Sequence, residues 1–291
     1  MGDETVAAVT GAAVFLPLTE IPDTWEGLPV RILGARAFAG DTTLKEIVIP
    51  DSVRVFENFV FHNCKQLRRM TLTDTVTEYG DGVIRACTAL RDIDLTMQNE
   101  NYTLIARMLS DSDYTMTFHL RLPEAEAVLT FPGFVYDFTE NTMARTIQFN
   151  IEGSGMAFRE CVSRTGIDFD AYDRMFERAK LDDIPIITAI LTGRLMYPCG
   201  LSMQAASRYE AYLRAHEERI LSHLIEIKDR AAIRFLTGRR LLSREALAHT
   251  APFAASSGDA QIAALLSSYA ASLRTEQEDA KGGASKGSLT I

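Results

Sequence analysis

Cysteine is scarce in this sequence, which has four cysteines among 291 residues and no two of them in a CxxC pair. This scarcity excludes a small scaffold held by disulfides and the common structural zinc motifs, both of which need more closely spaced cysteines. Two of the four, Cys64 and Cys87, are 23 residues apart. We expect them to be small buried residues with free thiols, and a disulfide or a metal-binding pair is the alternative.

Long apolar runs and an excess of positive charge are also absent. The formal net charge is −9, so nucleic acid, whose phosphate backbone attracts basic proteins, is not expected as a partner. No stretch approaches the roughly 20 apolar residues that a membrane-spanning helix needs. The first residues, Met1-Gly2-Asp3-Glu4, are acidic where a secretory signal is positively charged. We therefore expect a cytoplasmic protein, with an exported or cell-surface protein whose signal was trimmed as the alternative.

The motifs of common catalytic and nucleotide-binding sites are missing too. There is no P-loop and no GxGxxG, and Gly153-Ser154-Gly155 does not have the frame of a nucleophile elbow. His216-Glu217-Glu218 lacks the second histidine of HExxH. A nucleophile–base pair of Cys161 and His119 is conceivable, but no motif supports it. We predict a protein that is not an enzyme, with no catalytic residues, no metal and no cofactor.

What the sequence does contain is a repeat of 23 residues. Apolar residues recur at this step in four series: Phe38, Phe61 and Ile84; Leu44, Leu67 and Leu90; Ile47, Met70 and Ile93; Ile49, Leu72 and Leu95. A fixed period of about 20 to 29 residues with this leucine spacing is typical of a leucine-rich solenoid. Such a repeat buries its apolar face only by stacking on its neighbours, and the stack presents an extended surface to other molecules.

Each repeat contains a short strand. In Leu44–Pro50 the two-residue alternation places Ile47 and Ile49 inward and Glu46 and Val48 outward. Turn residues from Pro50 onward end this strand.

The repeat resembles the bacterial BspA-type leucine-rich repeat, whose units read approximately IG-x-x-AF-x-x-C-x-x-L-x-x-I-x-IP-x-x-V. The matching residues are Ile32, Gly34, Ala37, Phe38, Leu44, Ile47, Ile49, Pro50 and Val53, then Phe61, Asn63, Cys64, Leu67, Met70, Leu72 and Val76, then Cys87, Leu90, Ile93 and Leu95. Asp41 replaces the usual cysteine, and Thr73 replaces the proline. The resemblance implies a solenoid over residues 14 to 95. Members of that family include adhesins, scaffolds and uncharacterised proteins.

Beyond the repeats we expect a small capping sheet over residues 115 to 151. Its strands are expected at Thr115–Leu122, Leu129–Pro132 and Arg145–Ile151, with a hairpin turn at Pro123–Glu126. The step of 23 places Met116 opposite Ile93.

From Gly155 onward the apolar period changes from 2 to about 3.6, which predicts helices. Helices are expected at Asp170–Leu181, from Ser202 to about His216 and after Ser243. Two segments recur: Ile190–Arg194 as Phe235–Arg239, and Asp229–Leu236 as Asp259–Leu266. These recurrences resemble ankyrin-like helix pairs, and Gly193 and Gly238 are expected at helix ends with positive φ.

The predicted fold is therefore α+β, a leucine-rich-repeat solenoid with a small capping sheet, followed by an all-α ankyrin-like helical array. The expected domains are the solenoid at 1–110, the capping β segment at 111–155, the helical region at 156–274 and a disordered tail at 275–291.

The best candidate site is the outward face of the repeat strands. The step of 23 aligns two rows of outward residues: Glu46, Arg69, Asp92 and Thr115, and beside them Val48, Thr71, Asp94 and Thr117. One interpretation is that these alternating charges neutralise one another. The other is that they form a recognition stripe for a protein partner of unknown identity. We predict a non-catalytic protein–protein interaction module or scaffold, and the alternative is a cell-surface adhesin that binds host protein or glycan.

Overall fold

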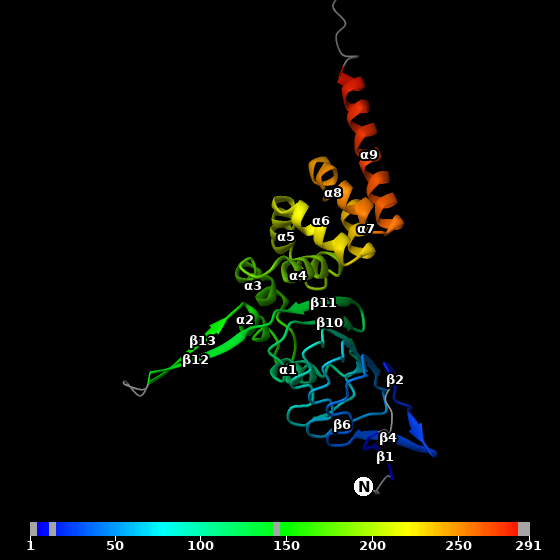
Figure 1. Ribbon diagram of the computed structural model, residues 1–291, viewed down its shortest axis with the longest axis vertical. Helices are drawn as coiled ribbons and strands as arrows, with labels where there is room; N and C mark the ends of the chain where they lie inside the picture. The colour runs from blue at the N-terminus through cyan, green and yellow to red at the C-terminus, as the bar shows by residue number, and fades with distance from the viewer. Residues whose placement is uncertain (1–4, 12–15, 142–145, 285–291) are drawn as a thin grey trace, which may run out of the picture. The chain divides into compact units, whose positions relative to one another are not determined.

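The computed structural model describes residues 5–11, 16–141 and 146–284, and it divides into two compact units, Met1–Ser202 and Met203–Ile291 (Figure 1). The first unit holds all the β-structure and the helices α1 to α4, and the second holds the helices α5 to α9. The fold is of the α+β class that the sequence predicts.

Two parallel sheets form the walls of the solenoid in the first unit. The larger sheet has the order β11-β10-β9-β7-β5-β2, and the smaller has the order β1-β4-β6-β8, with β3 paired to β4. The bounds are Ala7–Val9 (β1), Leu18–Glu20 (β2), Thr24–Trp25 (β3), Leu28–Leu33 (β4), Glu46–Val48 (β5), Val55–Phe56 (β6), Arg69–Thr73 (β7), Glu78–Tyr79 (β8), Asp92–Thr96 (β9), Met116–Arg121 (β10) and Glu126–Phe131 (β11). The colour passes smoothly from blue to green along the larger sheet (Figure 1).

The pairing register confirms the 23-residue repeat. Glu46 lies opposite Arg69, and Arg69 lies opposite Asp92. The inward residues of the same strands are buried between the two sheets. Phe61 and Leu67 are fully buried, and the ring of Phe61 stacks on the ring of Phe38 with centroids 5.0 Å apart. The apolar side chains of each turn thus pack against those of the next turn.

The tight turns of the repeat place residues with positive φ at fixed positions. One position is Arg36, Phe59 and Gly82 (φ 60°, 61° and 61°), and the other is Gly40, Asn63 and Ala86 (φ 75°, 62° and 63°). At Gly82 a Cβ atom would also lie 2.6 Å from the ring of Phe59, so glycine at this position leaves room for that ring and takes up the positive φ without strain. The period is therefore present in the backbone conformation and not only in the core.

Cys64 and Cys87 are buried free thiols that occupy equivalent positions in successive turns, as expected. The Sγ of Cys64 donates to the carbonyl oxygen of Phe38 (2.9 Å), and the Sγ of Cys87 donates to that of Phe61 (3.0 Å). The hydrogen bond with Cys64 and then burial raise the pKa of Cys87. Both cysteines therefore serve as small core residues.

A helix inserted between β9 and β10 changes the repeat step. This helix, α1 (Tyr102–Ser110), follows a connection whose amide groups at Gln98, Asn99 and Asn101 donate to the buried carboxylate of Asp74. The step from β9 to β10 is two residues longer than the repeat step of 23, so Phe118 and not Met116 lies opposite Ile93. The predicted register was therefore wrong at this strand. An even shift preserves the faces, and Met116 and Phe118 are both buried.

The predicted capping sheet is confirmed only in part. The strands β10 and β11 form an antiparallel hairpin, whose turn is closed by a bond from the Leu122 N–H to the Ala125 carbonyl (2.8 Å), and this hairpin extends the solenoid sheet. The strands β12 (Val135–Asn141) and β13 (Thr146–Glu152) pair only with each other, as a separate hairpin (Figure 1). β12 was not predicted.

Three helices complete the first unit: α2 (Gly155–Arg159), α3 (Phe169–Ala179) and α4 (Ile184–Met196). Gly193 lies inside α4 without a positive φ, so its predicted role at a helix end was wrong. A Cβ at Gly193 would lie 2.8 Å from the carbonyl oxygen of Val128, which shows that glycine lets α4 approach the edge strand β11 closely. The helix thereby covers an edge that would otherwise be open to pairing.

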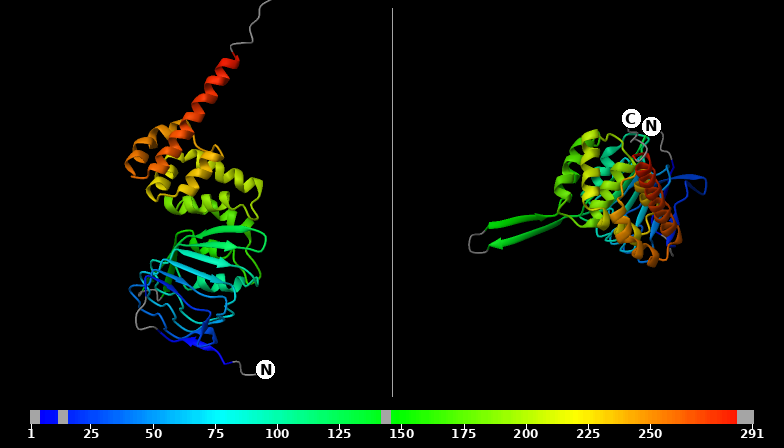
Figure 2. Two further views of the ribbon diagram at one scale, coloured as in Figure 1. Left: turned by 90° about the vertical axis from the view of Figure 1, so that its right-hand side faces the viewer. Right: turned by 90° about the horizontal axis from the view of Figure 1, so that it is seen from above.

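The second unit is all helical, with α5 (Met203–Ala215), α6 (Glu217–Glu226), α7 (Arg230–Gly238), α8 (Arg244–Ser256) and α9 (Ala260–Ala284). Figure 2 shows these helices from two further sides. The 30-residue recurrence is confirmed at the helix starts, because the carboxylates of Asp229 and Asp259 accept from the amides of Ala232 and Ile262.

Two predictions for the second unit were wrong. Gly238 ends α7 without a positive φ, and Arg240 has one instead (55°). The tail expected to be disordered from residue 275 is helical as far as Ala284, because α9 continues through it, and residues 285–291 lie outside the described residues. Within the described part of the chain, no helix has both the length and the apolar character needed to cross a membrane.

Candidate interaction surface on the solenoid sheet

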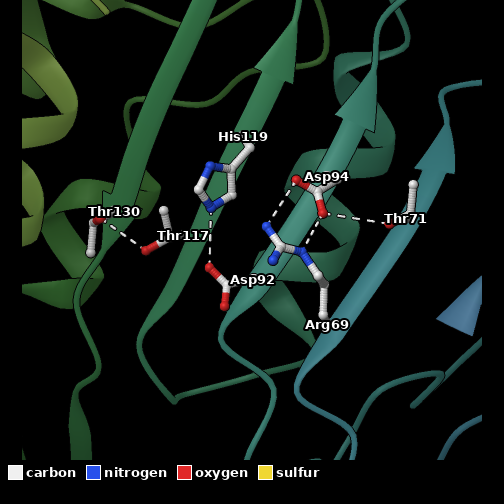
Figure 3. Close-up of polar contacts among 7 residues, drawn as sticks. All are labelled: Arg69, Thr71, Asp92, Asp94, Thr117, His119 and Thr130. Atoms are coloured by element: carbon white, nitrogen blue, oxygen red, sulfur yellow. Dashed lines mark hydrogen bonds and ion pairs between the residues drawn. The ribbon is translucent and has the colours of Figure 1, made fainter. Parts of the chain in front are cut away.

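The outward side chains of β5, β7, β9 and β10 form one largely polar surface, here called the sheet face, and Figure 3 shows those of β7, β9 and β10. It consists of Glu46, Val48, Arg69, Thr71, Asp92, Asp94, Thr117 and His119. The two-residue alternation of the strands sends these residues outward while their neighbours fill the core. The structure therefore brings together seven of the eight residues predicted for this surface.

Thr115 is the predicted residue that does not belong to the sheet face. It precedes β10, and its hydroxyl accepts a hydrogen bond from the Gly133 N–H (2.9 Å). Thr117 lies opposite Asp92 in its place, and His119 lies opposite Asp94. His119 was missed as a member of this surface, although it alternates with three buried residues in its strand and an outward position could have been inferred from that pattern.

The central charge pair of the sheet face is Arg69 with Asp94. The Nε and Nη2 atoms of Arg69 lie 2.5 and 3.3 Å from the carboxylate oxygens of Asp94, and the Thr71 hydroxyl lies 3.4 Å from the same carboxylate. The hydrogen bond to Asp94 raises the pKa of Arg69. Arg69 retains 42% of its side-chain exposure, so it is paired but still accessible.

A second group of contacts lies along β10. The Nε2 of His119 is 3.1 Å from a carboxylate oxygen of Asp92, and the hydroxyls of Thr117 and Thr130 are 2.9 Å apart (Figure 3). Of the four charged residues predicted for this surface, only Glu46, at the edge away from β10, has a side chain that makes no hydrogen bond or ion pair within the described residues. The contacts support the interpretation that charges on this face neutralise one another.

The hollow beside the sheet face is too small for a typical small-molecule site. Its volume is about 140 Å³, against roughly 300 to 1,000 Å³ for most ligand pockets. The residues that line it include Asp94, His119, Arg121, Glu126 and Tyr197. The face is therefore better suited to contact across its breadth than to enclosing a substrate.

The chemistry considered for Cys161 and His119 does not assemble. His119 hydrogen-bonds Asp92, and the Sγ of Cys161 is directed to the carbonyl oxygen of Ala157 (3.7 Å). Burial raises the pKa of Cys161 to about 11, which keeps the thiol protonated near neutral pH. Within the described residues, no three histidine, cysteine or acidic side chains are grouped so that they could hold a metal ion.

Two arginines of the first unit, the half-buried Arg159 and the buried Arg194, act as structural ties. Arg194 is fully buried in an ion pair with Asp173, with nitrogen–oxygen distances of 2.8 and 3.0 Å, and it also donates to the carbonyl of Cys199. The guanidinium of Arg159 donates to carbonyl oxygens at the end of α1, in α2 and beside β10 and β11. Burial lowers the pKa of Arg159 to about 10. Neither residue lies on the sheet face.

Stacked parallel turns, a leucine at each turn and a strand register that repeats every 23 residues over β5, β7 and β9 define a leucine-rich-repeat solenoid. Its repeats are of the BspA type: residues 21–112 match the model of the BspA type leucine rich repeat region in six copies, which confirms the resemblance seen in the sequence. The match runs from β3 to just beyond α1, and β1, β2, β10 and β11 of the solenoid sheets lie outside it.

Two crystal structures of bacterial leucine-rich repeat proteins are similar to this chain. The protein from Eubacterium ventriosum is 26% identical over 30% of this chain and 22% of its own length, with a TM-score of 0.26. The protein from Bacteroides ovatus is 29% identical over 33% of this chain and 28% of its own length, with a TM-score of 0.29. The chain thus spans less than a third of either relative. No curated protein matches it.

Proposed function

We propose that this chain is a non-catalytic protein-interaction module that presents the sheet face of its solenoid to a protein partner. Leucine-rich repeats of this family suggest protein interaction, and proteins that carry them are generally non-catalytic. The observation that carries the proposal is the sheet face itself, a regular surface on which Arg69 is paired with Asp94 and His119 with Asp92.

Preorganisation is the physical reason why such a face suits binding. A partner that binds flexible charged side chains must order them, at a cost of about 0.5 to 1.5 kcal/mol for each. On the sheet face the Arg69–Asp94 and His119–Asp92 pairs already fix these side chains. Their fixed pattern of charge favours a complementary partner and opposes partners with the wrong pattern.

The test is capture of partners from native lysate by the wild-type protein and by Arg69→Glu. The variant places Glu46, Glu at 69 and Asp92 in one outward row, so we expect captured partners to be lost. Arg174→Glu is the matched control, since Arg174 is exposed on α3 away from the sheet face. Equal capture by wild type and Arg69→Glu would contradict the proposal.

The helices of the second unit are the alternative binding surface, and a truncation after Ser202 removes them. This site is preferable to a truncation near Ile151, which would remove α4 and uncover the edge strand β11. If partners survive Arg69→Glu but are lost in a folded protein truncated after Ser202, the helical array carries the binding.

A further inference from the structure

A row of three basic residues lies beside the sheet face, at the residue that comes just before each repeat strand. This basic row consists of Lys45 before β5, Arg68 before β7 and Arg91 before β9, and all three are exposed. The backbone places them one ladder step apart. The carbonyl oxygen of Lys45 accepts from the Arg68 N–H (2.7 Å), and that of Arg68 accepts from the Arg91 N–H (3.0 Å).

The basic row differs from the adjoining row of the sheet face in its balance of charge. Glu46, Arg69 and Asp92 alternate in sign, and Arg69 is paired with Asp94. Among the described residues, by contrast, no carboxylate forms an ion pair with Lys45, Arg68 or Arg91.

Further contacts of the basic row are few. Arg91 donates to the carbonyl oxygen of Leu90 (3.0 Å), and its guanidinium lies 6.0 Å from the ring centre of Tyr114, which holds it at the end of the row.

Like charges on neighbouring strands repel one another, so an unneutralised row of this kind is unfavourable for the isolated protein. A group of negative charges from outside would remove the repulsion. The row is therefore placed to receive an anionic ligand.

We propose that the basic row binds a short acidic segment of a protein partner in extended conformation. The inference rests on the proposed function, because it names the chemistry of a segment that the interaction module would hold. Two ladder steps of about 4.8 Å span about 10 Å, which is the length of three residues of extended chain at about 3.3 Å each. Alternate side chains of an extended chain lie on the same face, about 6.6 Å apart, so acidic residues at every second position of the segment face the row together, and the long side chains of Lys45, Arg68 and Arg91 can adjust to their spacing.

The charges around the row limit the ligand to a short segment. Glu46 and Asp92 lie in the adjoining row and repel an acidic chain from the sheet face. A long polyanion such as nucleic acid needs many basic contacts and meets the net negative charge of the rest of the protein. Arginine also suits carboxylates, since its planar guanidinium can bind both oxygens of one carboxylate.

The experiment measures binding of a fluorescein-labelled peptide of about five glutamates to the full-length protein, by fluorescence anisotropy at about 50 mM and about 200 mM salt. The test variant is Lys45→Gln/Arg68→Gln/Arg91→Gln. The matched control is Arg107→Gln/Arg174→Gln/Arg178→Gln, which removes the same charge from exposed positions on α1 and α3. We expect the test variant to bind about tenfold or more weakly than the control, and the wild type to lose affinity at the higher salt.

Several outcomes would overturn the inference. The wild type could fail to bind the peptide at the lower salt. Alternatively, the test and control variants could lose affinity equally, which would show that only the net charge of the protein matters for binding. A heparin hexasaccharide bound through the same three residues, with no binding of the peptide, would assign the row to a sulfated glycan instead. Arg68→Gln alone tests the middle of the row with the smallest change, and a loss of about threefold is expected.

A thermal melt shows whether the triple variant is folded, and relief of repulsion predicts an unchanged or higher melting temperature. The partner capture described above separates this inference from the proposed function. If Arg69→Glu abolishes capture while the row variant and its control bind the peptide equally, the sheet face is the interaction site and the basic row is not.

Discussion

The solenoid and the helical array of this protein both repeat, but they repeat in different ways. In the solenoid, the strands β5, β7 and β9 are related by a constant step of 23 residues. Among the helices, the capped starts at Asp229 and Asp259 are 30 residues apart, whereas Ile190–Arg194 of α4 recurs 45 residues later as Phe235–Arg239 of the second unit.

The difference follows from what joins one repeat to the next. Successive turns of the solenoid are joined by backbone hydrogen bonds, so an odd slip would turn every inward side chain to the surface. Helices contact each other through side chains that form ridges and grooves, and these contacts tolerate changes in helix length and loop length. A backbone ladder therefore keeps an exact period in the sequence, and a helical array does not need to.

The largest expected effect comes from breaking the solenoid core. Phe61→Ala removes a fully buried ring that stacks on Phe38 and lies edge-on to Phe56, so the free energy of unfolding should fall by about 4 kcal/mol. Urea denaturation followed by circular dichroism measures the change. Phe253→Ala, at a ring that is 41% exposed on α8, is the control and should cost less than about 1 kcal/mol. A similar small loss for both variants would contradict the stacked core.

The strength of the ladder also explains which parts of the fold the sequence predicts. The inward series through Ile47, Met70 and Ile93 could be read directly, because each member is fixed by the backbone of the turn before it. The register at β10 could not, since it depends on the length of the connection through α1, and a repeat step says nothing of an insertion. Gly193 was misplaced for a related reason: its small size serves the approach of α4 to β11, a tertiary contact that no local pattern reveals.

The sheet face was predictable in its position and less so in its contacts. Alternation identified Arg69 and Asp92 as outward residues in one row, but Arg69 pairs with Asp94, two residues along the next strand. Side-chain rotamers decide which diagonal neighbours form a pair, and the alternation along a strand predicts only which residues share a face. His119 entered the face through the same two-residue shift that removed Thr115.

The second prediction tests the source of stability in the helices next to the solenoid. We expect side-chain pairs to stabilise their packing, whereas backbone hydrogen bonds join the turns of the solenoid. Arg194→Met leaves the carboxylate of Asp173 buried without its ion-pair partner, so the free energy of unfolding should fall by about 3 kcal/mol. Combining it with Asp173→Leu removes both charges, and the double variant should recover most of the loss. Urea denaturation of the four proteins checks this. A double variant that is less stable than Arg194→Met would contradict the account.

A third prediction concerns acid. Burial acts to raise the pKa of Asp259, but hydrogen bonds from the Arg230 guanidinium and the Ile262 amide outweigh it, and the pKa lies below its usual 3.8. Because the folded value is below the unfolded one, the contribution to stability is complete above about pH 4 and is lost as the pH falls through the folded value. Asp259→Asn should therefore be less stable than wild type at neutral pH, and the difference should shrink in acid. Thermal melts from about pH 6 to about pH 2 measure it, and a constant difference would contradict the prediction.

The smallest effect sharpens the comparison most, because the same substitution should have opposite signs in the two regions. Ala86 occupies the solenoid position where Gly40 and Asn63 also have positive φ, a conformation that costs alanine about 1 kcal/mol. Ala86→Gly relieves this strain but adds freedom to the unfolded chain, so a net gain of about 0.5 kcal/mol is expected. Ala211→Gly, at an exposed position inside α5, should lose about 1 kcal/mol instead. Urea denaturation of both variants provides the measurement. If Ala86→Gly were also destabilising, the positive φ at residue 86 would not strain alanine as proposed. The repeat would then be imposed by the core and the strand ladder, and not by the turn at that position.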